Sequence, residues 1–558
     1  MDRIKWIYSV PGRSKFYVFL LMILQTASGA IGVFYALFMK DIVDNAVSGD
    51  KQGFIYSIVR IIILIVINIA FYASINRVTE LAKSTIENKF KGRLFDNILK
   101  RDYAEVTAIH SGEWINRMTN DAVLVANGCV EIVPSICGMV VRMISALVLI
   151  IVIDWRIAVV MVPAGILVGL LAYACRKKLK KMHKEVQEAD GKFRIFIQEN
   201  IASLIMIRSF ATQVQTASEA EEKMADHKNI RMKRNLFSNM TSSGFSLAMN
   251  AMYFLGVFYG GMGILAGTIT YGTLMAITQL ISQIQGPIVS ITGMIPRIFT
   301  ITASAERLME IEGYKEAEIS KCSRDEINTY YRDTFEGIGI KNGFFAYKGA
   351  TDEMPQVIEN FNIDIDKGQY IAFTGHSGCG KSTVLKLIMN IYDLDSGSLY
   401  VKEGGEQVPI TGPARNLFAY VPQGNLLMNG TVRDIICFSD KSRSNDEEAI
   451  DKALKIACAD EFVYALEQGI DTVLKERGTG LSEGQMQRLA VARAIFSERP
   501  ILILDEATSA LDEVTEEKLL TNLRSMTDMT VIIVTHRKKA LTICDRVFDF
   551  SERIESDD

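Results

Sequence analysis

The sequence predicts a chain of two unlike parts, an all-α membrane domain of six transmembrane helices followed by an α/β domain. Three observations indicate this fold class. Apolar segments recur six times before residue 300, each long enough, or nearly so, to cross a hydrocarbon core of about 30 Å. After about residue 310, alternating strand and helix patterns replace them. The 558 residues are also too many for one compact domain.

The composition restricts the class of protein. Hydrophobic residues make up 49% of the chain and charged residues 23%, with a formal net charge of -4. A charge this small gives no field that would attract nucleic acid, so no nucleic-acid partner is expected. The eight cysteines lack paired metal-ligand spacing and are expected to be reduced thiols. The first apolar run is twice as long as a signal peptide's apolar region, so it predicts a membrane span.

The membrane domain is predicted over residues 1–310. Spans are expected at 16–39, 54–75, 132–153, 157–174, 245–266 and 273–296. Four of them contain no charged residue; the exceptions contain Arg60 and Arg142. The stretch "RKKLKKMHK" (176–184) has no acidic residue, and residues 76–131 are rich in Lys and Arg, which predicts that the N-terminus and both long connections lie in the cytoplasm. Because these connections have mostly helical composition, spans two to five are expected to continue beyond the membrane as helices.

Polar residues within the spans leave two interpretations open. They line a cavity or join helices by hydrogen bonds; they are Gln25, Ser28, Asn250, Gln279, Ser282 and Gln283. Arg142 lies about ten residues into the third span. It either faces that cavity, where its charge would favour an anionic or amphipathic molecule, or extends to the inner headgroups.

The α/β domain is predicted over residues 336–558, after a charged linker at 311–335. The stretches "QYIAFTG", "ILILDEA" and "VIIVTH" are continuous apolar runs typical of buried parallel strands. The first of them leads directly into "GHSGCGKST" (375–383), and the helical "VLKLIMNIY" follows.

This strand–loop–helix context is that of a phosphate-binding loop. Gly375, Gly378 and Gly380 allow the backbone to direct successive N–H groups at phosphate oxygens. Lys381 supplies a point charge for the β- and γ-phosphates, and Ser382 offers a hydroxyl to Mg²⁺. A glycine-rich turn without this function would not need lysine followed by serine at this place.

Two further strand ends add to the phosphate loop. Asp505 ends the apolar strand of "ILILDE" and can hold Mg²⁺ through water, and Glu506 beside it is placed as a general base. His536 ends "VIIVTH" and can reach a γ-phosphate. Alone, each would equally suit a structural role; beside a phosphate loop they indicate a nucleotide site.

The order of these motifs resembles the ATP-binding cassette of ABC transporters, a P-loop NTPase (ABC ATPase). The matching stretches are the phosphate loop, "YVPQGN" with Gln423, "LSEGQ" (481–485), "ILILDE", "SALD" (509–512) and His536. Tyr347 in "FFAY" stands where that family stacks an aromatic ring on adenine, and Glu476 where exporter-type cassettes touch the membrane domain.

The membrane half resembles the same family. Residues 110–122 and 198–213 are similar to its two cytoplasmic coupling segments, and 267–288 to its sixth span. The chain is therefore identified as a half-transporter of the exporter type, whose members include multidrug, lipid and peptide transporters.

The resemblance implies a set of site residues and two ligands, ATP and Mg²⁺. Catalysis would involve Glu506, with Gln423 and His536 positioning water and phosphate. Magnesium would be held by Ser382, Gln423 and Asp505. Nucleotide contacts would come from Tyr347, Gly375, His376, Ser377, Gly378, Cys379, Gly380, Lys381, Ser382, Thr383, Ser482, Glu483, Gly484, Gln485 and Asp512.

The resemblance also implies a dimer, since each ATP would lie between the phosphate loop of one cassette and the "LSEGQ" of the other. Glu483 stands where this motif usually has a second glycine. Either the chain pairs with an identical copy and tolerates Glu483, or it pairs with a different half-transporter.

The expected function is ATP-driven export of an amphipathic, lipid or peptide substrate. The chain is expected to cross the cytoplasmic membrane of a bacterium several times, with its nucleotide-binding domain in the cytoplasm. An ATP-gated channel or regulator, or an exporter-fold importer, is the alternative.

Overall fold

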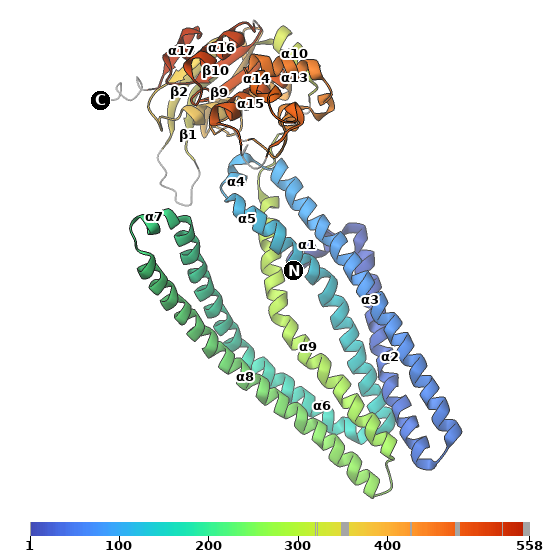
Figure 1. The fold of residues 1–558 in the computed structure, drawn as a ribbon. Coiled ribbons are helices and arrows are strands. Elements are labelled where there is room, and N and C mark those ends of the chain that lie inside the picture. Colours follow the sequence, from blue (N-terminus) through green and yellow to red (C-terminus); the bar gives the residue numbers. More distant parts are fainter. Residues whose placement is uncertain are drawn as a thin grey trace. The chain divides into compact units, whose positions relative to one another are not determined.

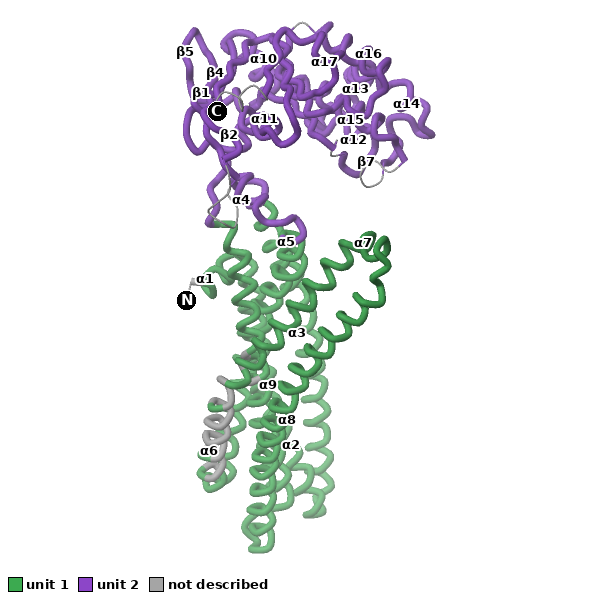
Figure 2. The backbone as a smooth tube through the Cα atoms, turned by 90° about the vertical axis from the view of Figure 1, so that its left-hand side faces the viewer, with its two compact units in different colours: residues 1–96, 114–312 green, residues 97–113, 313–558 purple. Residues whose placement is uncertain are grey.

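The computed structural model describes residues 2–318, 320, 322–347, 356–424, 427–474, 480–526 and 528–550, with only the backbone for most of residues 158–177. The chain forms two compact units, coloured separately in Figure 2. Unit 1 comprises residues 1–96 and 114–312, and unit 2 comprises residues 97–113 and 313–558.

Long helices make up unit 1 (Figure 1). The long ones are α2 (Lys15–Ser48), α3 (Lys51–Lys100, whose last turn belongs to unit 2), α6 (Ala122–Ala202), α8 (Gln213–Leu265) and α9 (Tyr271–Glu310). Shorter helices are α1 (Asp2–Ser9), α5 (Ser111–Asn116, whose first half belongs to unit 2) and α7 (Leu204–Ser209). At 1.5 Å per residue, the 50 residues of α3 extend about 75 Å, more than twice the thickness of a hydrocarbon core. The long connections between the predicted spans therefore form helical extensions of those spans.

The 81 residues of α6 are two helices joined at Asp154, whose φ of -158° and ψ of 107° are not helical. Its carboxylate accepts a hydrogen bond from the backbone N–H of Arg156 at 3.0 Å and another from the hydroxyl of Tyr259 at 2.7 Å. Asp154 thus caps the second helix and ties the turn to α8.

By length and composition, five helices of the described part could cross a membrane. They lie within Gly12–Ser48, Lys51–Lys100, Ser111–Ile157, Gln213–Leu265 and Tyr271–Gly313. The predicted fourth span, 157–174, is helical but falls where the structure describes mostly the backbone.

Small residues allow α2 and α6 to approach closely. A Cβ built on Gly29 would lie 2.5 Å from the carbonyl oxygen of Gly138, and one on Gly138 would lie 2.9 Å from the carbonyl oxygen of Gln25. Such contacts are typical of helices that pack within a membrane, where apolar burial drives association less than close packing does.

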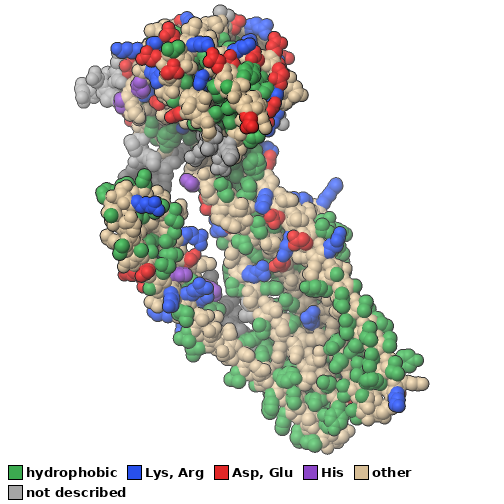
Figure 3. Space-filling view, in the orientation of Figure 1, with side chains coloured by type: hydrophobic (Ala, Val, Ile, Leu, Met, Phe, Trp, Pro, Cys, Tyr) green, Lys and Arg blue, Asp and Glu red, His purple; other side chains and the backbone are tan. Residues whose placement is uncertain are grey.

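Unit 1 exposes large apolar side chains over its membrane-length helices (Figure 3). On α3 alone, Ile62 and Ile63 are each 53% exposed, Val66 60% and Ile69 62%. A continuous apolar surface of this kind suits hydrocarbon rather than water.

A buried ionic group joins the beginning of α6 to α9. Asp121 is 2% exposed and lies in a π-helical turn, Arg117–Asp121, that precedes α6. Its carboxylate accepts two hydrogen bonds from the guanidinium of Arg307, at 2.8 and 2.5 Å, and one from the hydroxyl of Ser304 at 2.7 Å. Arg117 in turn pairs with Glu310 at 2.8 Å.

Unit 2 is an α/β domain. Its strands are β1 (Phe335–Phe345), β2 (Ile358–Asp366), β3 (Tyr370–Thr374), β4 (Ser396–Glu403), β5 (Glu406–Pro409), β6 (Phe418–Val421), β7 (Gly430–Thr431), β8 (Val473–Leu474), β9 (Ile501–Asp505), β10 (Thr530–Val534) and β11 (Arg546–Asp549). Its helices are α4 (Tyr103–Thr107), α10 (Arg324–Asp333), α11 (Lys381–Ile388), α12 (Val432–Ile436), α13 (Glu447–Ile456), α14 (Asp460–Tyr464), α15 (Glu483–Phe496), α16 (Glu513–Arg524) and α17 (Lys538–Thr542).

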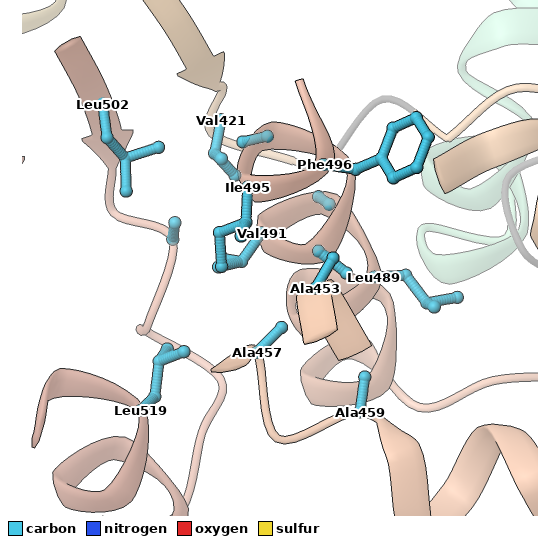
Figure 4. Packing of buried hydrophobic residues seen from close by; sticks show 14 of the residues in the cluster. Val421, Ala453, Ala457, Ala459, Leu489, Val491, Ile495, Phe496, Leu502 and Leu519 are labelled. Carbon is cyan, nitrogen blue, oxygen red and sulfur yellow. The ribbon is translucent and has the colours of Figure 1, made fainter. Parts of the chain in front are cut away.

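The central sheet of unit 2 has the order β11-β3-β10-β9-β6, and its neighbouring strands are parallel. Alternate side chains of these strands enter different apolar clusters, because successive residues of a strand point to opposite faces. Leu502 and Leu504 pack in the cluster formed with α15 (Figure 4), whereas Ile501 and Ile503 pack in the other. A second, antiparallel sheet has the order β2-β1-β4-β5.

The segment expected as a linker contains helix α10. Ser323 and Glu326 form a capping box at its start, and Ile327 and Tyr331 are buried in the core of unit 2. Part of 311–335 is therefore packed structure.

Residues 97–113 belong to unit 2 although they are distant from it in sequence. The N–H of Asp102 donates to the carbonyl of Lys315, and the N–H of Ala317 donates to the carbonyl of Lys100, both at 2.8 Å. The ring of Tyr103 meets that of Tyr392 edge-on at 5.5 Å.

Candidate nucleotide-binding site

The predicted phosphate loop lies between β3 and α11, where the sequence placed it. Gly375, Gly378 and Gly380 have φ angles of 133°, 86° and 95°, a region that side-chain-bearing residues avoid. Lys381 begins α11 and is only 6% exposed. Its ammonium donates to the carbonyl oxygens of Gly375 at 2.6 Å and His376 at 2.9 Å, so it lies folded over the loop.

Asp505 connects the end of β9 to the phosphate loop. One carboxylate oxygen accepts a hydrogen bond from the hydroxyl of Ser382 at 3.2 Å, and the other accepts one from the hydroxyl of Tyr420 at 3.1 Å. Burial raises the pKa of Asp505, and the nearby Glu506 adds to the rise; the two hydrogen bonds oppose it. The hydroxyl and carboxylate oxygens are the hard ligands that Mg²⁺ prefers.

Glu506 follows β9 in a strained backbone conformation. Its φ of 51° is in the left-handed region, which costs a residue with a side chain about 1–3 kcal/mol. Its N–H donates to the carbonyl of Val534 in β10 at 3.1 Å, and its carboxylate accepts a hydrogen bond from the side-chain amide of Gln423 at 2.8 Å. The structure therefore brings Gln423, after β6, to the proposed base.

His536 and Tyr347 occupy two further places in unit 2. His536 is exposed and follows β10, the strand between β3 and β9. Tyr347 follows β1, and its hydroxyl lies 3.0 Å from that of Thr383 in α11. Its ring meets those of Phe345 and Tyr392 edge-on, at 5.0 and 5.5 Å.

The "LSEGQ" motif forms the start of α15. Ser482 is the N-cap and forms a capping box with Gln485, so both side chains bond the helix's own backbone. Glu483 is the first helical residue and is exposed. A Cβ on Gly484 would lie 2.9 Å from the carbonyl oxygen of Ala510, which explains the need for glycine at that position.

Asp512 ends the loop that follows Glu506. Its carboxylate caps α16 by accepting hydrogen bonds from the backbone N–H groups of Val514 and Thr515, at 3.2 and 3.0 Å. These bonds lower its pKa. Asp512 thus has a structural role within the chain, whatever it contacts in a dimer.

The parallel order gathers these residues, because the carboxyl ends of β3, β10, β9 and β6 lie along one edge of the sheet. Glu476, expected to face the membrane domain, lies outside the described residues.

Three residues near this site were not predicted from the sequence: Tyr420, Gln487 and Arg537. Of these, only Tyr420 carried a signal, its place at the strand end before Gln423.

The second predicted coupling segment, 198–213, forms the end of α6 and α7 in unit 1. Its tip presents large apolar side chains, with Ile205 75%, Met206 54% and Phe210 71% exposed.

Both halves of the chain match family models. Residues 18–288 match the ABC transporter transmembrane region, and residues 358–509 match the ABC transporter model. The chain is 30% identical over 473 residues to an "ATP-dependent lipid A-core flippase" of Syntrophus aciditrophicus (strain SB), covering 82% of this chain and 74% of the relative.

Two other similarities agree. A "Leukotoxin translocation ATP-binding protein" of Mannheimia haemolytica is 29% identical over 368 residues, covering 65% of this chain and 50% of that protein. The solved "Structure of a bacterial Atm1-family ABC exporter with ATP bound" has the same fold, with a TM-score of 0.79 at 19% identity, covering 97% of this chain and 94% of that one. The chain, with a membrane region followed by an ATPase region, belongs to the ABC transporter family as an ATP-driven exporter half-transporter.

Proposed function

We propose that this chain exports an amphipathic, lipid-like molecule across the cytoplasmic membrane of a bacterium, with Mg²⁺-dependent ATP hydrolysis by unit 2 in the cytoplasm. The observation that carries the proposal is the meeting of three groups at the sheet edge. The phosphate loop with Lys381 provides a cradle for phosphate. Ser382 and Asp505 provide oxygen ligands for a metal ion, and Glu506, bonded by Gln423, provides a base.

Ser382 and Asp505 would hold the magnesium ion, which supplies positive charge against the phosphates when bound. Burial raises the pKa of Asp505, and a bound cation would oppose this by favouring the ionised carboxylate. We assign Gln423 to the attacking water rather than to the metal, because its amide bonds Glu506.

Three residues then have separate roles in the hydrolysis of ATP. Lys381 exchanges its two loop carbonyls for phosphate oxygens. Glu506 accepts the proton of the attacking water, a role worth about 10²–10⁴ in rate. His536 contacts the γ-phosphate from the end of β10.

The working unit would be a dimer, in which Ser482 and Gly484 approach the ATP bound to the other subunit. Glu483 fits this arrangement, because an exposed carboxylate at a helix N-terminus stabilises the helix dipole and can point to solvent. Two copies of this chain, or this chain with a second half-transporter, could supply the paired surfaces.

The cargo class rests on the relatives and on unit 1. Proteins similar to this chain are named as a lipid flippase and a toxin translocator. Within unit 1, Gln283 donates to the carbonyl of Gly32 in α2 at 3.1 Å, and Asn250 bonds Ser246 in its own helix. Gln283 therefore joins α9 to α2, whereas the bond of Asn250 stays within α8. The exposed Arg142 is the candidate contact for an anionic headgroup.

The experiment is Mg²⁺-ATPase activity of the purified chain in lipid nanodiscs, with its oligomeric mass and Glu506→Gln as the blank. Turnover by a two-chain particle that falls at least about 10²-fold in the blank supports a homodimer with Glu506 as base. A silent or monomeric wild type indicates a different partner, and an active blank contradicts the assignment of Glu506.

Transport is tested by flipping of a fluorescent anionic lipid in proteoliposomes. Loss of flipping in Arg142→Gln, with basal ATPase unchanged, supports the headgroup contact. Equal flipping in the two proteins contradicts it.

A further inference from the structure

The loop Thr508–Asp512, which follows the proposed base, is held from two sides by the side chains of Gln487 and Arg537. Within the loop the N–H of Ser509 donates to the carbonyl of Glu506 at 3.2 Å, so the position of Ser509 and that of the base are linked. Gln487 reaches the loop from α15, and Arg537 reaches it from the junction of β10 and α17.

Arg537 is the residue after His536, and its guanidinium bonds three acceptors. It donates to the carbonyl of Ser509 at 2.5 Å, to the carbonyl of Leu511 at 2.8 Å and to the carboxylate of Glu516 at 2.9 Å. Only a planar fork with several N–H groups can satisfy acceptors in these fixed directions, which the single ammonium of lysine does not reproduce.

Glu516 completes this side of the loop from α16. It is 2% exposed, and its second oxygen accepts a hydrogen bond from the hydroxyl of Thr508 at 2.8 Å. Burial of a charge is costly, and apolar packing often stabilises a protein as well as a buried ion pair does. The pair with Arg537 is thus better explained by the conformation it imposes than by the stability it adds.

Gln487 holds the loop from the other side. It is 3% exposed and lies two residues beyond Gln485 on α15. Its amide donates to the hydroxyl of Ser509 at 2.9 Å and accepts from the N–H of Ala510 at 3.0 Å. Both the N–H group and the oxygen of this buried amide therefore form hydrogen bonds with the loop.

We propose that Gln487 and Arg537 are positioning residues that fix the loop 508–512, and with it Glu506, between the "LSEGQ" helix and the strand end that carries His536. The proposal rests on the proposed function, in which "LSEGQ" serves the partner's ATP and Glu506 and His536 serve the chain's own. Through their hydrogen bonds, the two side chains connect the "LSEGQ" helix, which acts on the partner's ATP, to Glu506 and His536, which act on the chain's own ATP. Closure at one ATP site would therefore position Glu506 at the other.

The test compares Arg537→Gln and Gln487→Leu with a matched control, all in the full chain in nanodiscs. The control is Lys539→Gln, because Lys539 bridges the same two helices, α17 and α16, through Glu517 at 2.9 Å and lies two residues along the chain from Arg537. The expected result is a kcat lowered about 10- to 100-fold in both test variants, because small displacements of a reacting group have effects of this size. Equilibrium binding of ATP, and its KM, should stay within about twofold of wild type. The control should keep wild-type turnover.

Amide hydrogen exchange provides a readout that does not need turnover. Exchange at residues 508–512 should accelerate in both test variants and not in the control, while exchange in β3 and β9 stays unchanged. Arg537→Lys keeps the charge opposite Glu516 without the fork, and should recover part of the lost kcat.

Three outcomes overturn the inference: unchanged loop exchange in both variants, wild-type kcat in both variants, or a loss of kcat that merely follows lost ATP binding and thermal stability. A wild type without ATPase activity would instead indicate that a different partner chain is needed, and loop exchange would still decide the positioning role.

Discussion

Removing one partner of the buried Asp121–Arg307 pair should destabilise unit 1 more than removing both. In Arg307→Met, the carboxylate of Asp121 stays buried, loses the guanidinium and keeps the hydrogen bond from the hydroxyl of Ser304. In the double variant Asp121→Leu/Arg307→Met, both charges of this pair are removed. The asymmetry arises because an unpaired charge in a protein interior cannot regain its water.

The magnitude follows from the exposure of the two side chains. Loss of one partner of a buried pair costs about 3–5 kcal/mol. The side chain of Arg307 is 43% exposed and that of Asp121 is 3% exposed, so water reaches the pair from one side and the lower end of the range is expected. At about 2 °C per kcal/mol for a unit of this size, Tm should fall by about 6 °C in Arg307→Met. Asp121→Leu should lower Tm less, because the guanidinium left behind can be hydrated.

The assay is thermal unfolding of the four proteins in identical nanodiscs, arranged as a double-mutant cycle. The double variant should have a higher Tm than Arg307→Met. Additive losses, or an Arg307→Met protein as stable as wild type, would show that the pair is not energetically coupled.

Three further predictions concern unit 2. Gly484→Ala should lower kcat at least about tenfold, because its Cβ would press on the carbonyl of Ala510, and ATP binding by the same chain should persist; unchanged turnover would contradict the contact. Tyr347→Ala should weaken ATP binding by about 1–3 kcal/mol, the range for base stacking on an aromatic ring, whereas Tyr347→Phe should nearly match wild type in the same titration. The pKa of Asp545 is lowered, first by its hydrogen bonds from Arg524, so its stabilisation is present above its unfolded pKa and disappears as pH falls through the folded pKa. Asp545→Asn should therefore lower Tm at pH 7 and have little effect on Tm at the acidic end of a pH series; an equal effect at both ends would refute this.

Much of the site could be predicted from sequence because its signals are local. The glycines of the phosphate loop occupy backbone angles that only glycine tolerates readily, and the apolar runs before Asp505 and His536 are buried strands of one parallel sheet. The long apolar segments likewise predict helices, since length and composition alone determine whether a segment can cross a membrane.

The remaining features depend on contacts between distant residues. Neither Gln487 nor Arg537 stands out in its own stretch, because each gains a role only when the fold brings the loop 508–512 beside it. Helix α10 is a different case: the spacing of Ser323 and Glu326 is a capping-box signal, which the high charge of the segment obscured.

The membership of residues 97–113 in unit 2 has a consequence for how such a protein can be divided or recombined. A separately expressed ATPase that starts at residue 313 would lose the partners of the Lys315 carbonyl and the Ala317 N–H, and would uncover the ring of Tyr392. A chimera that joins this ATPase to another membrane half at residue 313 would replace the same surface with a foreign one. Domain exchange should therefore transplant residues 97–113 together with 313–558, which makes the exchangeable module discontinuous in the gene although it is continuous in space.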